Sequence, residues 1–145
     1  LQARYPDLAE AIVPGGWLEQ SDLACAFRLA DVLASPSVCF DSFPTVNLEG
    51  MAAGAVPVTT CFGGASEAVL DGETGFVVNP YNINALADRI TQLLTDEALR
   101  TRMAQAGRDR VNQHFLRSHQ TSAMLKIYDR AREKLHMREK RQKLL

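Results

Sequence analysis

Two carboxylates near the start of an expected helix have the residue types and the spacing to do chemistry. Asp41 and Glu49 stand eight residues apart in the stretch "DSFPTVNLEGMAAGAVPV". Pro44 suits the first turn of a helix and Gly54 suits its end, so we expect a helix that begins at Pro44 or the next residue and ends at Ala53. Asp41 would then lie on the loop before the helix, and Glu49 more than one turn into it.

The start of this helix favours a phosphate group between the two acids. The first backbone N–H groups, here those of Thr45, Val46 and Asn47, have no partner within a helix and attract anions without help from a lysine. Carboxylates accept paired hydrogen bonds from neighbouring hydroxyl groups but repel phosphates. A ligand with hydroxyl groups at both ends and phosphates between them fits this order, and a nucleotide sugar is such a ligand.

A simpler interpretation needs no ligand. In it, Asp41 is an Asx-type residue that bonds the backbone of its own loop, and Glu49 is a half-exposed residue on a surface helix. The two residues alone do not decide between the interpretations, so both stay open at this point.

The pattern of apolar segments places these acids in an α/β fold. Short strand-like runs, among them residues 31–35, 55–60 and 74–78, alternate with helical runs. Such alternation is typical of a parallel sheet covered by helices, in which ligands bind beyond the carboxyl ends of the strands. About four short strands are too few for a complete doubly wound sheet, and an all-helical pattern follows from Asn82. We therefore predict an incomplete Rossmann-like parallel sheet flanked by helices, with a helical C-terminal extension.

Other residues receive structural interpretations. Gly63 and Gly64 predict a tight turn at a strand end, because no glycine-rich phosphate-loop signature surrounds them. Trp17, Phe27 and Met51 are expected in the core.

The bulk composition excludes several classes of protein. The 145 residues are 46% hydrophobic and 23% charged, as in a globular domain, and no apolar run approaches the roughly 18 residues that cross a bilayer. Cys25, Cys39 and Cys61 are widely spaced and form no C-x-x-C pair. We therefore expect reduced thiols, a cytoplasmic location, no metal site and no cofactor.

The stretch "ADVLASPSVCFDSFPTVNLEGMAAGAVPVTTCFGGASEAVLDGETGFVV", residues 30–78, resembles a known family. It is similar to the C-terminal, donor-binding half of retaining glycosyltransferases with the GT-B fold, of the group 1 or family 4 type. The resemblance rests on two acids at the E-x7-E spacing, a Phe-Pro step, Glu-Gly-Met-Ala-Ala-Gly, Val-Pro-Val and Gly-Gly-x-x-Glu, all in order. It extends over about residues 12–115.

The resemblance implies a role for each residue of the motif. Asp41 and Glu49 correspond to the catalytic pair, in which Glu49 holds the ribose hydroxyl groups of the donor nucleotide and Asp41 contacts the transferred sugar. The loop that lies against that sugar corresponds to Ser42, Phe43 and Pro44, and the amides that reach the pyrophosphate correspond to Thr45 and Val46.

The chain departs from the family pattern in three ways. Asp41 replaces the usual Glu, which shortens the reach of the carboxylate by roughly 1.5 Å. Pro44 replaces a common Gly and has no N–H to donate. The basic pair that neutralises the leaving pyrophosphate in the family would precede residue 1, and neither Arg4 nor Arg28 lies in a matching context.

The charge distribution divides the chain in two. Residues 126–145 hold eight basic and three acidic side chains, a net charge of +5, whereas the other residues hold eight basic and fourteen acidic side chains, a net charge of −6. We expect a partial nucleotide-sugar-binding Rossmann-like domain over 1–125 and a basic helical tail over 126–145. The tail is either a solvated helix end or a contact for an anionic membrane surface or for the rest of the enzyme. Nucleic acid is a poor fit because the bulk of the chain is acidic.

These inferences together predict the C-terminal part of an enzyme. It would transfer a hexosyl group from a nucleotide sugar to a sugar, lipid or protein acceptor with retention, in the cytoplasm or peripheral to the membrane. We expect little activity from this chain without the missing N-terminal domain, because the leaving diphosphate needs cationic help. The alternative is a non-catalytic remnant that binds a nucleotide or a partner chain. A sugar-nucleotide epimerase would need catalytic carboxylates that the sequence does not offer elsewhere.

Overall fold

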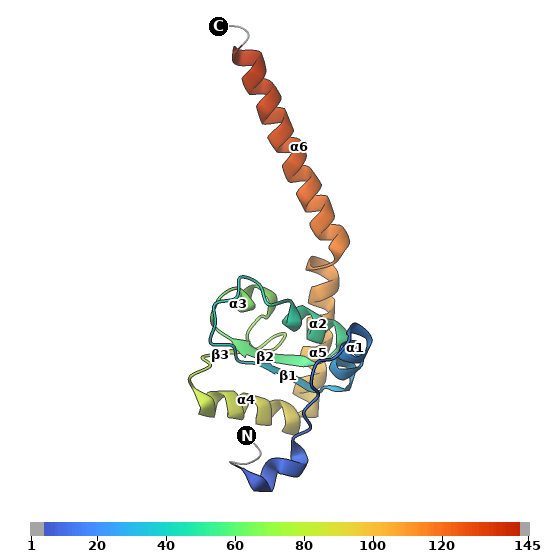
Figure 1. Ribbon diagram of the computed structural model, residues 1–145, viewed down its shortest axis with the longest axis vertical. Coiled ribbons are helices and arrows are strands. Elements are labelled where there is room, and N and C mark those ends of the chain that lie inside the picture. Colours follow the sequence, from blue (N-terminus) through green and yellow to red (C-terminus); the bar gives the residue numbers. More distant parts are fainter. Residues whose placement is uncertain (1–4, 143–145) are drawn as a thin grey trace.

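The computed structural model describes residues 5–142, which form a small α/β domain and a long helix that leaves it (Figure 1). The elements in order are a 3-10 helix η1 (Pro6–Ala11), α1 (Gln20–Leu29), β1 (Val32–Ser35), α2 (Thr45–Ala53), β2 (Val56–Thr60), α3 (Ala65–Ala68), β3 (Phe76–Val78), α4 (Ile83–Thr95), α5 (Glu97–His114) and α6 (Arg117–Gln142).

The sheet has three strands in the order β1–β2–β3, and both pairs are parallel. Val32 is opposite Val56, and Val58 is opposite Phe76. The prediction of an incomplete parallel sheet is therefore confirmed, although the described residues hold three strands rather than about four. The apolar run before Trp17 forms no strand, since Pro14 offers no N–H to a ladder and Gly16 has a left-handed φ of 61°.

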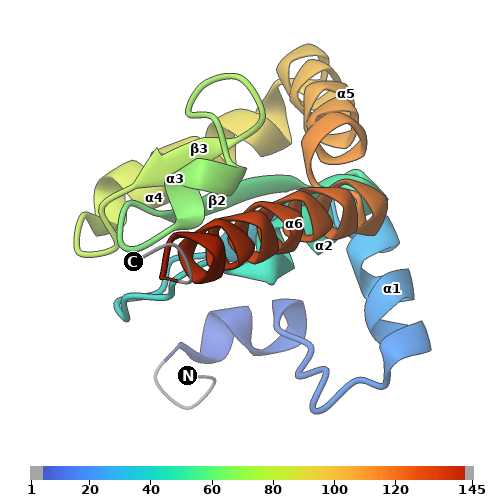
Figure 2. The ribbon, with the colours of Figure 1, turned by 90° about the horizontal axis from the view of Figure 1, so that it is seen from above.

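Helices cover both faces of the sheet. Helix α4 contacts all three strands on one face, and α2 and α3 contact β2 on the other, whereas α5 contacts β2 and packs against both α4 and α2 (Figure 1). Every residue of β2 is buried, as expected for the central strand of a covered parallel sheet. Helix α1 packs beside α2 at the edge of the domain, which Figure 2 shows from above.

The core lies between the sheet and these helices. Phe27 and Met51 are buried as predicted, with Met51 fully enclosed. Leu93 is fully buried on α4, but its neighbour Leu94 is 55% exposed. Because consecutive helical residues lie about 100° apart, only one of the two can face the sheet squarely.

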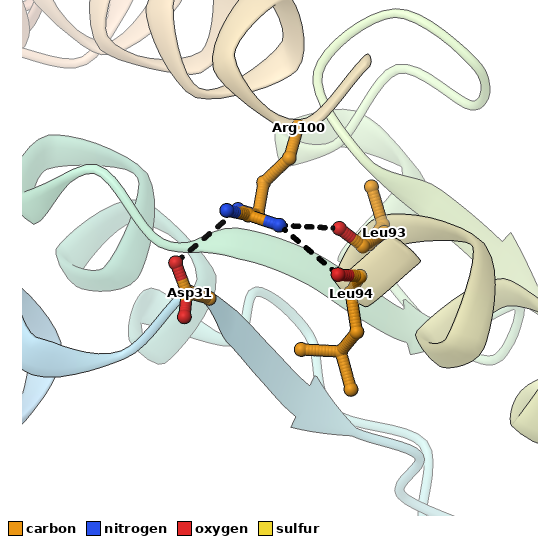
Figure 3. A network of polar contacts seen from close by, with 4 residues as sticks. All are labelled: Asp31, Leu93, Leu94 and Arg100. Atoms are coloured by element: carbon orange, nitrogen blue, oxygen red, sulfur yellow. Dashed lines mark hydrogen bonds and ion pairs between the residues drawn. The ribbon is translucent and has the colours of Figure 1, made fainter. Parts of the chain in front are cut away.

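A single arginine ties the end of α4 to the start of α5 and to the entry of β1 (Figure 3). Arg100 donates to the carbonyl oxygens of Leu93 at 2.9 Å and Leu94 at 3.4 Å, and its Nε lies 3.2 Å from Asp31 Oδ1. The bonds to the carbonyl oxygens satisfy the exposed end of α4 and contribute more than the ion pair, because the Asp31 side chain is 61% exposed and water screens it.

Helix α6 extends away from the domain without packing on the sheet (Figure 1). It runs through the predicted boundary at residue 126 as one continuous helix, so the tail is helical over its described part. Met124, Ile127, Tyr128 and Leu135 are each at least 45% exposed. Contact of this helix with an anionic membrane surface stays a prediction. None of the helices in the described part of the chain is long and apolar enough to cross a membrane.

Candidate functional site

The N-terminus of α2 lies just beyond the carboxyl end of β1 and lacks a side-chain cap. The helix occupies the predicted residues because Pro44 precedes Thr45 and Gly54 ends it with a left-handed φ of 106°. The Asn47 N–H donates to Pro44 O at 3.2 Å, whereas the N–H groups of Thr45 and Val46 have no hydrogen-bond partner among the described residues. Two amides thus stay without a protein partner at a helix start, where the helix dipole favours an anion.

A buried polar cluster fixes this helix start against the sheet. Ser35 Oγ at the end of β1 donates to Asn47 Oδ1 at 2.8 Å, and Asn47 Nδ2 donates to Thr59 Oγ1 of β2 at 3.1 Å. Ser35 Oγ also lies 3.1 Å from Thr59 Oγ1, and Asn47 and Thr59 are almost completely buried. The cluster joins three elements at the strand ends, so it positions the amides of Thr45 and Val46.

We predict that Asn47→Ala lowers the free energy of unfolding by about 2–4 kcal/mol. The change removes two buried hydrogen bonds and leaves a small cavity. Asn112→Ala, on the exposed side of α5, is the matched control and should change stability by less than about 0.5 kcal/mol. Urea titration of both variants measures the difference, and equal midpoints would show that the cluster does not anchor α2.

The two glycines after β2 hold the loop that carries Asp41. The Gly64 N–H donates to Asp41 O at 2.9 Å, and Gly63 has a φ of 65°. A Cβ added at Gly64 would lie 2.0 Å from Ser42 O, so only glycine allows the two backbones to approach this closely. The predicted tight turn is confirmed, and its contact with the acidic loop is a feature that the sequence analysis missed.

Asp41 caps its own loop. Its Oδ1 accepts from the Phe43 N–H at 2.9 Å, which is the Asx-type bond of the simpler interpretation. The side chain is nevertheless exposed, and its second oxygen has no partner among the described residues. Ser42 is exposed as well, whereas Phe43 turns inward against Phe115, with ring centroids 5.8 Å apart.

Glu49 lines a cavity of about 660 Å³ between α1 and α2. Trp17, Glu19, Leu23 and Arg28 line the same cavity. The prediction that Trp17 belongs to the core is wrong, because the side chain is 94% exposed. Trp17 lies in the short segment before α1, outside the apolar core and at the rim of this cavity.

Glu49 and Asp41 lie on different sides of the start of α2. Thr45 and Glu49 are one turn apart, which is about 6 Å along the helix axis, and Asp41 precedes the helix on the loop held by the glycines. Asp41 is not among the residues that line the cavity of Glu49. The structure therefore does not bring Asp41 into the cavity of Glu49, and the succession of hydroxyl, phosphate and hydroxyl contacts along this edge stays a prediction.

Sequence reasoning missed Trp17 and Arg28 as residues near the site. An aromatic residue in an apolar run is by default a core residue, and the only signal against this was the Gly15–Gly16 pair just before Trp17. Arg28 follows Ala24 by one turn of α1, and both face the cavity. No group of three His, Cys, Asp or Glu side chains in the described part of the chain is placed to hold a metal ion.

The open parallel sheet with helices on both faces defines a Rossmann-like domain of the α/β class. Residues 7–110 match the family model described as glycosyl transferases group 1. The chain belongs to this family, and its fold is that of the C-terminal domain of GT-B glycosyltransferases.

Relatives with assigned names include the glycogen synthase of Mycobacterium tuberculosis, 35% identical over 114 residues, which are 79% of this chain and 27% of that protein. The phosphatidyl-myo-inositol mannosyltransferase of Mycobacterium leprae is 32% identical over 89% of this chain and 34% of its own length. The chain thus spans about a third or less of these relatives.

Solved structures agree with the fold. The sucrose-phosphate synthase of Thermosynechococcus elongatus superposes with a TM-score of 0.83 and 28% identity, covering 91% of this chain and 33% of its own. Anabaena HepE, solved in complex with UDP and glucose, gives a TM-score of 0.67 and 26% identity, covering 73% of this chain and 29% of its own.

Proposed function

We propose that this chain binds the nucleotide-sugar donor of a hexosyltransferase. The nucleoside lies in the cavity between α1 and α2, with Glu49 on the ribose hydroxyl groups. The diphosphate lies on the amides of Thr45 and Val46, and Asp41 contacts the hexose that is transferred. The transfer retains the configuration of the sugar, as in the family that the motif resembles.

The free amides at the start of α2 carry this proposal. They are backbone anion-binding groups one helical turn from Glu49, and one helical turn matches the separation of a ribose from a diphosphate. A metal or cofactor is not needed for this binding mode. The complex of the related HepE with UDP and glucose supports a nucleotide and a sugar as ligands.

We expect this chain to bind the donor but to transfer the sugar poorly, because few basic side chains are near the proposed diphosphate. Arg28 and Arg89 are the basic side chains among the described residues up to position 99. Arg89 lies over the Phe76 ring, and Arg28 lines the cavity of Glu49. Stabilisation of a leaving diphosphate is worth several kcal/mol, so we expect the chain to bind the donor with little transfer unless an N-terminal domain supplies cations and the acceptor site.

Trp17 provides a direct test, because it is the single tryptophan of the chain and lies at the rim of the cavity. Titration with UDP, GDP and ADP should change its fluorescence with saturation for one of the bases, and the matching UDP-, GDP- or ADP-hexose should compete. The change arises because a base entering the cavity displaces water from the exposed indole. Free uridine, guanosine and adenosine are the controls and should bind more weakly, since they lack the diphosphate.

Failure of all three nucleotides to alter the fluorescence would refute the donor site. Where transfer is detectable, the proton NMR spectrum of the first product reports the anomeric configuration, and an inverted product would refute retention. The non-catalytic alternative predicts the same nucleotide binding but no transfer even when an N-terminal domain is present.

A further inference from the structure

Three aromatic side chains form a row along the carboxyl ends of the three strands. Phe40 follows β1, Phe62 follows β2 and Tyr81 follows β3. The Phe40 and Phe62 rings are stacked with centroids 5.2 Å apart at 15°, and the Phe62 and Tyr81 rings are tilted with centroids 6.0 Å apart. We call these three residues the aromatic row.

The aromatic row is not part of the core. Phe40 is 81% exposed and Tyr81 is 71% exposed. The buried clusters of the domain contain none of the three rings. Stacking of the rings on one another buries only part of their apolar surface, so the row presents flat ring faces and edges to the solvent at the edge of the sheet where ligands bind in this fold class.

A hollow lined by amide side chains adjoins the row at Tyr81. It has a volume of about 480 Å³ and is lined by Asn79, Tyr81, Asn82, Ile83 and Asn84. Asn79 Oδ1 accepts from the Tyr81 N–H at 3.0 Å, and Asn82 Oδ1 accepts from the Ala85 N–H at 3.0 Å. These bonds fix both amide groups and leave their NH2 groups as donors without a partner among the described residues.

The combination of ring faces and neutral amides suits an uncharged sugar. The C–H groups of a pyranose carry partial positive charge and pack on the negative face of an aromatic ring, while the hydroxyl groups bond to amide donors and acceptors. The row and the hollow contain no basic side chain. A phosphorylated or carboxylated saccharide would meet no basic side chain there, only the first amides of α4 at the hollow, and Asp41, next to Phe40, would repel it.

The row begins at the loop assigned above to the transferred hexose. Phe40 precedes Asp41, and Phe62 precedes Gly63, whose backbone packs on that of Asp41. We propose that the aromatic row and the asparagine hollow bind a neutral oligosaccharide, which makes the acceptor an uncharged saccharide rather than a lipid or a protein side chain. The assignment as acceptor rests on the proposed function, whereas the binding of a neutral saccharide does not.

The test measures saccharide binding to the chain by saturation-transfer NMR, with and without UDP. Maltotriose and mannotriose are the neutral probes, and trigalacturonate is the anionic probe. We expect at least one neutral trisaccharide to bind and trigalacturonate not to bind. Phe40→Ala and Tyr81→Ala should each weaken binding about tenfold, because each removes one stacking ring. Tyr81→Phe keeps the ring and should stay within about threefold of the wild type.

The outcomes separate this inference from the donor site. Since Phe40 and Tyr81 are exposed, their variants should keep the unfolding temperature, and they should bind the preferred nucleoside diphosphate as the wild type does. Binding of that nucleotide without binding of either neutral trisaccharide overturns the saccharide surface and leaves the donor site standing. Saccharide binding that depends on the row without any nucleotide binding refutes the donor site alone. The inference is also overturned if Phe40→Ala and Tyr81→Ala bind the trisaccharides as tightly as the wild type does, or if phosphatidylcholine micelles bind at the row in place of the trisaccharides.

Discussion

Glu49→Ala should weaken binding of the preferred nucleoside diphosphate about 100-fold, with little change in stability. A carboxylate that accepts two hydroxyl hydrogen bonds contributes on the order of 2–3 kcal/mol to binding, because each bond to a charged group is stronger than a neutral one. The side chain is exposed within helix α2, so its truncation removes no core contact. Titration of Trp17 fluorescence measures the dissociation constant, and the urea midpoint checks the fold.

Two controls isolate the ribose contact. Glu19 lines the same cavity as Glu49, so Glu19→Ala removes an equal charge without removing the proposed partner of the ribose and should change affinity less than about threefold. The matching 2′,3′-dideoxynucleotide should bind the wild type as weakly as the natural nucleotide binds Glu49→Ala. If the variant still distinguishes the two nucleotides as strongly as the wild type does, Glu49 does not hold the ribose.

The elements around this site were predictable because their signals are local. Helix α2 has its predicted bounds since Pro44 and Gly54 fix the backbone at its two ends. Strands β1, β2 and β3 are short apolar runs that end at polar or turn residues. Their parallel pairing follows from the helical segments between them, because a parallel pair needs a crossover.

The contacts that position the site were not predictable, because they join residues far apart in the chain. Ser35, Asn47 and Thr59 are ordinary polar residues in three separate segments, and only the fold shows that they share a buried cluster. The residue type alone predicts a core position for Trp17, and this prediction is wrong. Burial depends on where the neighbouring backbone runs, and Trp17 lies in the segment before α1, outside both buried clusters.

Gly64→Ala should destabilise the domain by about 3 kcal/mol and displace the loop that carries Asp41. The added Cβ would meet Ser42 O at 2.0 Å and Ser42 C at 2.9 Å, and both are backbone atoms that cannot rotate away. Overpacking of this kind costs about 1–3 kcal/mol or more. For a chain of this size the loss corresponds to a decrease of roughly 6–12 °C in the unfolding temperature. Differential scanning calorimetry measures it.

Gly72→Ala separates steric crowding from backbone strain. Gly72 has a φ of 76° but no atom within 4 Å of an added Cβ, so its substitution should cost only about 1 kcal/mol.

Binding adds a second readout that stability alone would not give. If Asp41 contacts the hexose, the wild type and Gly72→Ala should bind the nucleotide sugar more tightly than the nucleoside diphosphate, whereas Gly64→Ala should bind the two equally. A wild-type preference in Gly64→Ala would mean that the glycine turn does not set the position of the acidic loop, and Asp41 would then lose its assigned contact with the sugar.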